Sequence, residues 1–320
     1  MRRSETSFTT ALLTSRIVVS EARPLTAREF WMTFPNEEVL HELPSMDVDQ
    51  IAASCSVQHD EAERLRALLD GSRAFAFEIE RLEESGISIV TAFDDAFPQR
   101  LRVRLGRHCP ATLLTAGSLD WFSEPCIGIV GSRGISEAQI HAAEEAAKTC
   151  VAAGFGVISG LAKGIDATAM GAALSAGGRV CGIPTEGLRV VGRRPDIRSA
   201  IHDGVLAMAS PYGPDAPFSA GAAMGRNKIV YGLAEATVVI TSDKGKGGTW
   251  GGATEALQKH YGQVIVWEGS DVGEGNRAII DRGGIPIQDF TISSLEAALT
   301  KAALSTDGNI SEAVQIQTLF

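Results

Sequence analysis

The chain has 320 residues, of which 44% are hydrophobic and 21% charged, with a formal net charge of −10 at pH 7. This is the composition of a globular protein with one large domain or two of ordinary size. No apolar run reaches the roughly 18 residues of a membrane helix, and the opening MRRSETSFTT lacks the apolar segment of a signal peptide. Five cysteines without a CxxC pair argue against a zinc site or a disulfide framework and favour a cytoplasmic location.

The acidic balance argues against a polyanionic partner, but the charge is unevenly distributed. Residues 1–125 carry 13 Lys/Arg against 20 Asp/Glu, whereas residues 126–290 carry 15 against 16. Local fields steer ligands more strongly than total charge does. An anion site in the nearly neutral middle of the chain is therefore compatible with the composition.

The first part of the chain predicts helices. Residues 25–34, 47–56 and 60–86 carry apolar residues near the 3.6-residue spacing of amphipathic helices. Thr26, followed three residues later by Glu29, predicts a capping box. We expect a helical N-terminal domain over residues 1–85.

The pattern changes at residue 86. Short strands are expected in ISIVT and ATLLTAGSL, separated by a turn with two aspartates and a basic segment. Strands alternating with helices of 10–15 residues then indicate βαβ units and a parallel sheet, so the expected fold class is α/β. The domain is expected to extend to residue 295, with an edge strand near its end and a short helical tail over 296–320. The expected strands are 127–131, 156–160, 179–183, 205–209, 236–241 and 263–267, and the expected helices are 137–152, 166–176, 225–235 and 250–260.

Two turns follow buried strands and precede helices, which is where open parallel sheets bind ligands. The first is GSRGIS at 131–136 and the second is SGLAKGID at 159–166, in which Asp166 is expected to be the helix N-cap. Hydroxyls, a guanidinium and an ammonium group would line one crevice and could bind phosphate. The alternative is two tight structural turns, and neither turn matches GxGxxG or GxxxxGK[ST]. The candidate residues are Ser132, Arg133, Ser136, Ser159, Gly160 and Lys163.

Two further segments carry cations. Arg226, Asn227 and Lys228 follow Gly225 at the expected start of a helix, where cations are unfavourable unless an anion binds. The segment 244–252, KGKGGTWGG, is expected to be a loop with two lysines, Gly248, Thr249 and Trp250. Such a loop could bind phosphate and stack on a base of single-stranded nucleic acid or of a nucleotide. The alternative is a flexible loop with Trp250 packed inward.

Catalytic patterns are sparse. The six histidines are scattered outside these four segments, and no GxSxG or HExxH motif occurs. Glu255 and Asp243 are carboxylates near the fourth segment, and they are expected to be a helix-surface and a loop residue. We therefore expect no catalytic residue, no metal and no cofactor.

Together these motifs resemble the DprA/Smf (DNA-processing protein A) family. The matching segments are FDDAFPQRL, IGIVGSRGIS, GFGVISGLAKGIDATAMGAALSAGGRVCGIP and GRNKIVYGLAEATVVIT, which occur in the family's order. The resemblance implies an extended Rossmann-like domain that binds single-stranded DNA, forms a homodimer and helps to load a RecA-type recombinase during DNA uptake in natural transformation. It implies DNA contacts at Ser132, Arg133, Ser136, Ser159, Gly160, Lys163, Arg226, Asn227 and Lys228, to which the fourth segment adds Gly248 and Thr249.

Three departures from the family pattern keep an alternative open. Met170 interrupts GIDxxAH, Lys228 replaces an arginine, and GGTWGGATEA replaces SGSLxTA. The alternative is a nucleotide-binding sensor of a defence pathway, or a phosphoribohydrolase-like enzyme, on the same fold. Glu255 follows Thr249 by six residues, whereas that enzyme family has three.

Overall fold

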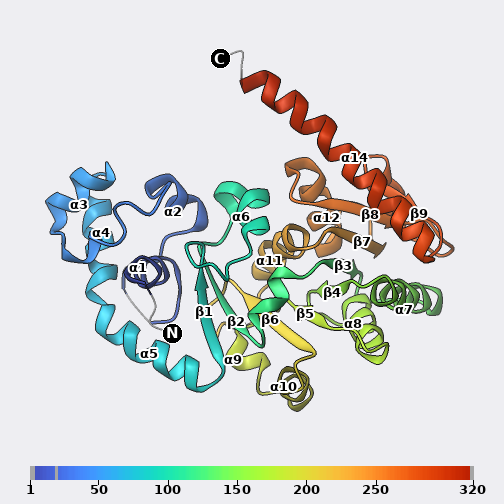
Figure 1. Cartoon of the computed structure of the whole chain (residues 1–320), viewed down its shortest axis with the longest axis horizontal. Helices are drawn as coiled ribbons and strands as arrows, with labels where there is room; N and C mark the ends of the chain where they lie inside the picture. Colours follow the sequence, from blue (N-terminus) through green and yellow to red (C-terminus); the bar gives the residue numbers. More distant parts are fainter. Residues whose placement is uncertain (1–3, 19–20, 318–320) are drawn as a thin grey trace. The chain divides into compact units, whose positions relative to one another are not determined.

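The computed structural model describes residues 4–18 and 21–317, with side chains as far as Leu304 (Figure 1). The first three residues of the expected helical domain and the last three of the expected tail lie outside this range. The chain divides into two compact units. One is formed by Met1–Ser123 and Pro184–Ser219, and the other by Glu124–Ile183 and Ala220–Phe320.

The first unit begins with helices, as the apolar spacing predicts. Phe8 and Phe75 meet edge to face at 5.3 Å between ring centroids, so the first and fifth helices share a core. The expected domain boundary at residue 85 stays a prediction. The helices are α1 (Glu5–Thr14), α2 (Ala27–Thr33), α3 (Val48–Cys55), α4 (His59–Asp70) and α5 (Ser72–Glu84).

Three antiparallel strands complete this unit. β1 (Ile87–Thr91) pairs with β2 (Thr112–Ala116), and β2 pairs with β6 (Leu206–Ser210). The short helices between them are not among the elements predicted from the sequence, because each has too few residues to show a clear periodicity. They are α6 (Gln99–Leu105), α9 (Leu188–Val191) and α10 (Pro195–His202).

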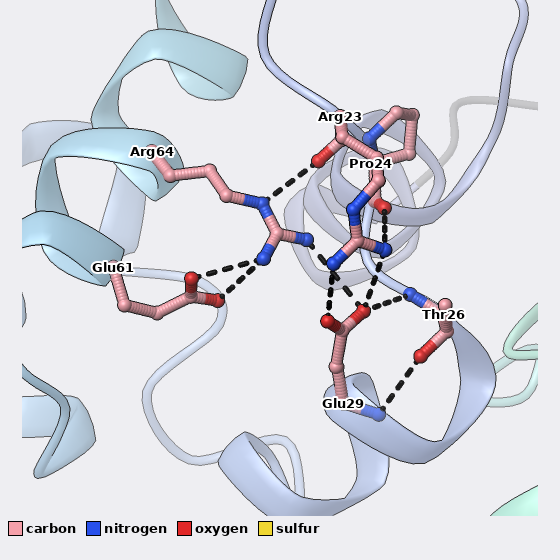
Figure 2. Close-up of polar contacts among 6 residues, drawn as sticks. All are labelled: Arg23, Pro24, Thr26, Glu29, Glu61 and Arg64. Atoms are coloured by element: carbon pink, nitrogen blue, oxygen red, sulfur yellow. Dashed lines mark hydrogen bonds and ion pairs between the residues drawn. The ribbon is translucent and has the colours of Figure 1, made fainter.

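A polar network joins the start of α2 to α4 (Figure 2). The Thr26 hydroxyl accepts the Glu29 N–H at 3.3 Å, and the Glu29 carboxylate accepts the Thr26 N–H at 2.7 Å, so the predicted capping box is confirmed. Glu29 also pairs with Arg23, and Arg64 donates to the Arg23 carbonyl oxygen at 2.9 Å and to Glu61. The Arg23 hydrogen bond is the main cause that lowers the pKa of Glu29 to about 2.

The second unit contains a sheet of six parallel strands in the order β5-β4-β3-β7-β8-β9. The chain moves outward in one direction through β3, β4 and β5, and in the other through β7, β8 and β9. This order is that of a Rossmann-like sheet. The predicted α/β class with a mostly parallel sheet is confirmed. The strands are β3 (Cys126–Gly131), β4 (Gly156–Ser159), β5 (Val180–Gly182), β7 (Ala236–Thr241), β8 (Gln263–Trp267) and β9 (Ile285–Ile287).

Helices cover both faces of this sheet. α7 (Glu137–Ala152) packs beside α8 (Ile165–Ser175) and α14 (Ile292–Gln317), whereas α12 (Gly247–Lys259) packs between α11 (Ala220–Leu233) and α13 (Glu274–Ile280). Right-handed crossovers require this arrangement, because the chain leaves β3 and β7 in opposite directions.

Two sequence expectations about these helices are wrong, and a third differs in length. α11 begins at Ala220, so Gly225 and the cations after it lie inside a helix and not at its start. α12 begins at Gly247, so the expected loop at 244–252 is helical in its second half. The expected tail is helical as predicted, but its helix is longer than expected and runs over Ile292–Gln317. In the first two cases tertiary packing overrides the low helix propensity of several glycines.

We predict that Glu29→Gln lowers the free energy of unfolding by about 1 kcal/mol at pH 7, a value kept small because solvent screens a partly exposed pair. The pKa of Glu29 is lowered in the folded state, so its contribution is present above the unfolded pKa and is lost as pH falls from about 4.5 towards 2. Urea unfolding at pH 7 and pH 3 measures both effects. Glu80→Gln, an exposed carboxylate on α5, is the control, and an equal loss for both variants contradicts the assignment.

Candidate nucleic-acid interface

The site begins where the parallel sheet reverses its order, between β3 and β7. The Ser132 N–H, directly after β3, donates to the carbonyl oxygen of Thr241 at the end of β7, at 3.1 Å. The Ser132 hydroxyl donates to the same oxygen at 3.4 Å. In open α/β sheets the crevice outside the carboxyl ends of the strands at this point is the usual ligand position.

The loop between β3 and α7 presents one cation. Arg133 is exposed, and a side chain at the neighbouring Gly134 would meet open space. The Ser136 hydroxyl instead accepts the Gln139 N–H at 3.4 Å, while the Gln139 side chain accepts the Ser136 N–H at 3.2 Å. Ser136 is therefore the N-cap of α7, and Arg133 is the side chain that this loop offers to a ligand.

The loop between β4 and α8 packs directly against the first loop. Gly164 has a φ of +86°, and a Cβ atom there would lie 2.5 Å from the Ser132 carbonyl oxygen. That oxygen accepts the Ile165 N–H at 3.3 Å. The close approach places exposed Lys163 beside the loop of Arg133. Gly164, not Asp166, is the N-cap of α8, so the expected capping role of Asp166 is wrong.

Asp166 has a different role, because its carboxylate is buried beneath the second loop. It is 5% exposed and accepts the Gly160 N–H at 3.1 Å. Burial raises the pKa of Asp166, while the charge of Arg226 and the N–H groups of Ala162 and Gly160 act to lower it. The carboxylate therefore holds the turn that carries Lys163 from the inside.

Arg226, on α11, lies close enough for its charge to act on this buried carboxylate. It is 5% exposed, and a methyl group on Gly160 would overlap its guanidinium group. Tyr231, further along the same helix, is 1% exposed, and burial together with Asp166 raises its pKa. The electrostatic coupling of Arg226 to Asp166 has no signal in the sequence, because no local pattern relates two residues so far apart in the chain. Ser159 is also internal, and its hydroxyl donates to the Ile129 carbonyl oxygen at 2.6 Å.

The start of α12 is attached to α11 through an amide. The Asn227 Nδ2 donates to the Gly248 carbonyl oxygen at 2.8 Å, and a Cβ atom on Gly252 would lie 3.1 Å from the Asn227 Cβ. Two exposed lysines, Lys244 and Lys246, precede this helix. The third and fourth predicted segments therefore meet, as the first and second do.

The predicted site residues fall into three groups by exposure. Only the exposed and half-buried ones can reach a ligand, whereas the buried ones hold the loops. Arg133, Lys163 and Gly248 are exposed, Ser132, Ser136, Asn227, Lys228 and Thr249 are half-buried, and Ser159, Gly160 and Arg226 are buried.

The exposed lysines are available to an anion. Among the residues that the structure describes, Lys163, Lys244 and Lys246 have no ion pair or hydrogen-bond partner. By contrast, Glu255 lies on α12 and pairs with Lys259 at 3.4 Å, one helical turn away.

Within residues 4–18 and 21–317, no cluster of His, Cys, Asp and Glu could hold a metal ion, and no helix there is long and apolar enough to span a membrane.

Comparison with known proteins agrees with this architecture. The sequence model of the family described as DNA recombination-mediator protein A matches residues 88–291. The DNA processing protein DprA of Bacillus subtilis (strain 168) is 29% identical over 152 residues, which are 47% of this chain and 51% of that protein. This chain thus spans about half the length of the curated relatives it matches.

Solved structures share the fold. The X-ray structure of DprA from Streptococcus pneumoniae has a TM-score of 0.73 and 21% identity, covering 93% of this chain and 98% of that one. A structure of DNA processing protein A from Helicobacter pylori, solved to explain how that protein binds single-stranded DNA, has a TM-score of 0.55 and 20% identity, covering 67% and 96%.

The fold is that of a Rossmann-like α/β protein whose loops at the switch point of the sheet carry exposed polar and cationic side chains. The chain belongs to the DprA/Smf family, because the family model matches more than half of its length.

We predict that Gly164→Ala lowers the free energy of unfolding by about 2–4 kcal/mol, since the positive φ and the nearby Ser132 oxygen both oppose a side chain. Gly171, on α8, has ordinary helical backbone and open space around it. Gly171→Ala is therefore the matched control and should be neutral or stabilise by up to about 1 kcal/mol. Chemical denaturation compares the two, and equal effects would contradict the close approach of the two loops.

A double-mutant cycle tests the buried pair. Arg226→Met should cost about 3–5 kcal/mol, because it leaves the Asp166 carboxylate buried without its counter-charge. Asp166→Asn should also destabilise, whereas the double variant should lose clearly less than the sum of the two. Urea unfolding at constant pH measures all four free energies. Strict additivity would show that the two charges are independent.

Proposed function

We propose that the chain binds single-stranded DNA along the carboxyl edge of its parallel sheet, without catalysing a reaction on it. The observation that carries the proposal is that the loops of Arg133 and Lys163 pack together and adjoin the end of β7, after which Lys244 and Lys246 follow. Buried Asp166 holds the second loop from below. Family membership supports the same function, as does the single-stranded DNA binding of the Helicobacter pylori protein.

The chemistry of these side chains suits a sugar–phosphate backbone. Arg133 can donate two parallel hydrogen bonds to one phosphate, and the lysines act as mobile point charges. Contacts of this kind depend on phosphate spacing and not on base identity. We therefore expect sequence-tolerant binding that weakens steeply with salt.

The nucleotide-sensor and phosphoribohydrolase alternatives are not favoured. Glu255, the candidate acid for the enzyme, lies on α12 in an ion pair with Lys259. The curated relatives that match the chain are DNA processing proteins.

We extend the proposal to partners on the basis of the family alone. A RecA-type recombinase would receive the bound strand, two copies of the chain would form a homodimer, and the pathway would be DNA uptake or recombination in the cytoplasm. Light scattering with and without an oligonucleotide tests the dimer, and a recombinase-loading assay on coated single strands tests the transfer.

The test is binding of fluorescent oligo-dT and of a duplex of equal length at several salt concentrations. The single strand should bind more tightly. The Arg133→Ala/Lys163→Ala variant should bind at least about tenfold more weakly. It should also reduce the slope of log K against log salt by about 1.4, since each lost contact to a single strand contributes about 0.7.

Lys148→Ala/Lys259→Ala is the matched control. It also removes two cations, but these lie on α7 and at the end of α12, in ion pairs with Glu145 and Glu255. The control should keep the parental affinity and slope. If both double variants bind as the parent does, or lose affinity equally, the assigned interface is wrong.

A further inference from the structure

One aromatic side chain at this edge of the sheet has no role in the core. Trp31, Trp121 and Trp267 are 5%, 2% and 7% exposed, whereas Trp250, in the first turn of α12, is half-buried. All four tryptophans of the chain lie in the part that the structure describes. Trp250 is therefore the one tryptophan that an external ligand can reach.

The indole of Trp250 is held on one side. The guanidinium carbon of Arg282 lies 5.0 Å from its ring centroid, and the Arg282 Nη1 donates to the Ala278 carbonyl oxygen at 2.7 Å. The arginine is thus fixed by the end of α13 and covers one face of the ring. A planar side chain supported in this way loses little further freedom when a second flat group stacks on it.

The surroundings of Trp250 are open. Gly252 needs to be small because it packs on Asn227, but a side chain at Gly247 or Gly251 would meet nothing within 4 Å. Glycine inside a helix costs stability relative to alanine, and Gly251 has neither a positive φ nor a close neighbour that would require it. The glycines leave the backbone around the indole accessible to a ligand. Four of the first six residues of α12 are glycines, namely Gly247, Gly248, Gly251 and Gly252.

The position of Trp250 relative to the cations suits the binding of single-stranded DNA. Lys244 and Lys246, without partners among the described residues, immediately precede its helix. Asn227 joins that helix to α11, whose Arg226 contacts the loop of Lys163. Successive nucleotides of a single strand present a phosphate to cations and a base to a neighbouring aromatic face.

We propose that Trp250 is a base-stacking residue that extends the interface beyond the phosphate contacts, with Arg282 as its support. This inference rests on the proposed function. A single strand running along Lys244 and Lys246 places one base against the indole face that Arg282 does not cover. The segment GGTWGG, which departs from the family pattern, then adds an apolar contact to an otherwise electrostatic site.

In the first experiment the full chain is titrated with oligo-dT and with an abasic oligonucleotide of the same length. Tryptophan fluorescence monitors both titrations. Oligo-dT should quench the emission, and the abasic strand should not. The other three tryptophans are buried, so quenching should disappear in Trp250→Phe.

The second experiment compares affinities. Trp250→Leu should weaken oligo-dT binding about 5- to 100-fold and leave binding of the abasic strand unchanged. The salt slope should stay constant because no charge is lost. Trp250→Phe should retain part of the affinity, and this variant keeps the test valid if the leucine variant does not fold.

The outcomes separate this inference from the function on which it rests. If the parent binds oligo-dT and the abasic strand equally well, without quenching, stacking is overturned and phosphate binding stands. If the parent binds neither strand, both proposals fail. Arg282→Ala should weaken oligo-dT binding while the abasic strand binds as before. Equal losses on both strands would instead assign Arg282 to a phosphate contact.

Discussion

The site depends on one constraint of parallel sheets: β3 and β7 lie side by side while their chains leave in opposite directions. The helices that follow these two strands cover opposite faces of the sheet. Neither helix therefore covers the carboxyl ends of β3 and β7. The hydrogen bond from the Ser132 N–H to the Thr241 carbonyl oxygen joins the ends of the two strands. The loops that carry the predicted site residues begin at these strand ends or pack against them. Arg133 and Lys163 lie on neighbouring loops because β3 pairs with β4 and Gly164 packs against the Ser132 carbonyl oxygen.

Close packing of the two loops buries backbone N–H groups, which need hydrogen-bond acceptors in the interior. Gly164 removes the side chain that would separate the first two loops, and the turn before it leaves backbone N–H groups pointing inward. Asp166 accepts the Gly160 N–H, and Arg226 supplies the counter-charge that a buried carboxylate requires. The pair thus helps to fix the backbone of the loop from which exposed Lys163 projects.

The sequence predicted the sheet much better than it predicted the roles of individual side chains. The strand and helix alternation after residue 126 is confirmed, because buried parallel strands are short, apolar and bounded by glycine turns. The predicted start of α11 was wrong because Gly221 and Gly225 interrupt AGAAMG, although its alanines and methionine favour a helix. The burial of Arg226 could not be predicted, since it depends on Asp166, which is distant in sequence. Arg133 and Lys163 were identifiable because exposed cations in glycine turns after strands need only local information.

The net charge of −10 is compatible with the proposed phosphate-binding edge, because screening limits the range of electrostatic forces. At physiological ionic strength the Debye length is about 8 Å, so carboxylates elsewhere on the surface act weakly on a strand held at the switch point. In the proposed complex the strand would meet Arg133, Lys163, Lys244 and Lys246 at close range. Asp243 and Glu137 are exposed acids on the same loops. Few cations release few counterions, so phosphate contacts alone give modest affinity. An acidic chain that binds single-stranded DNA at this edge therefore gains affinity most effectively from a contact that salt does not screen. A base stacked on the Trp250 indole would supply such a contact.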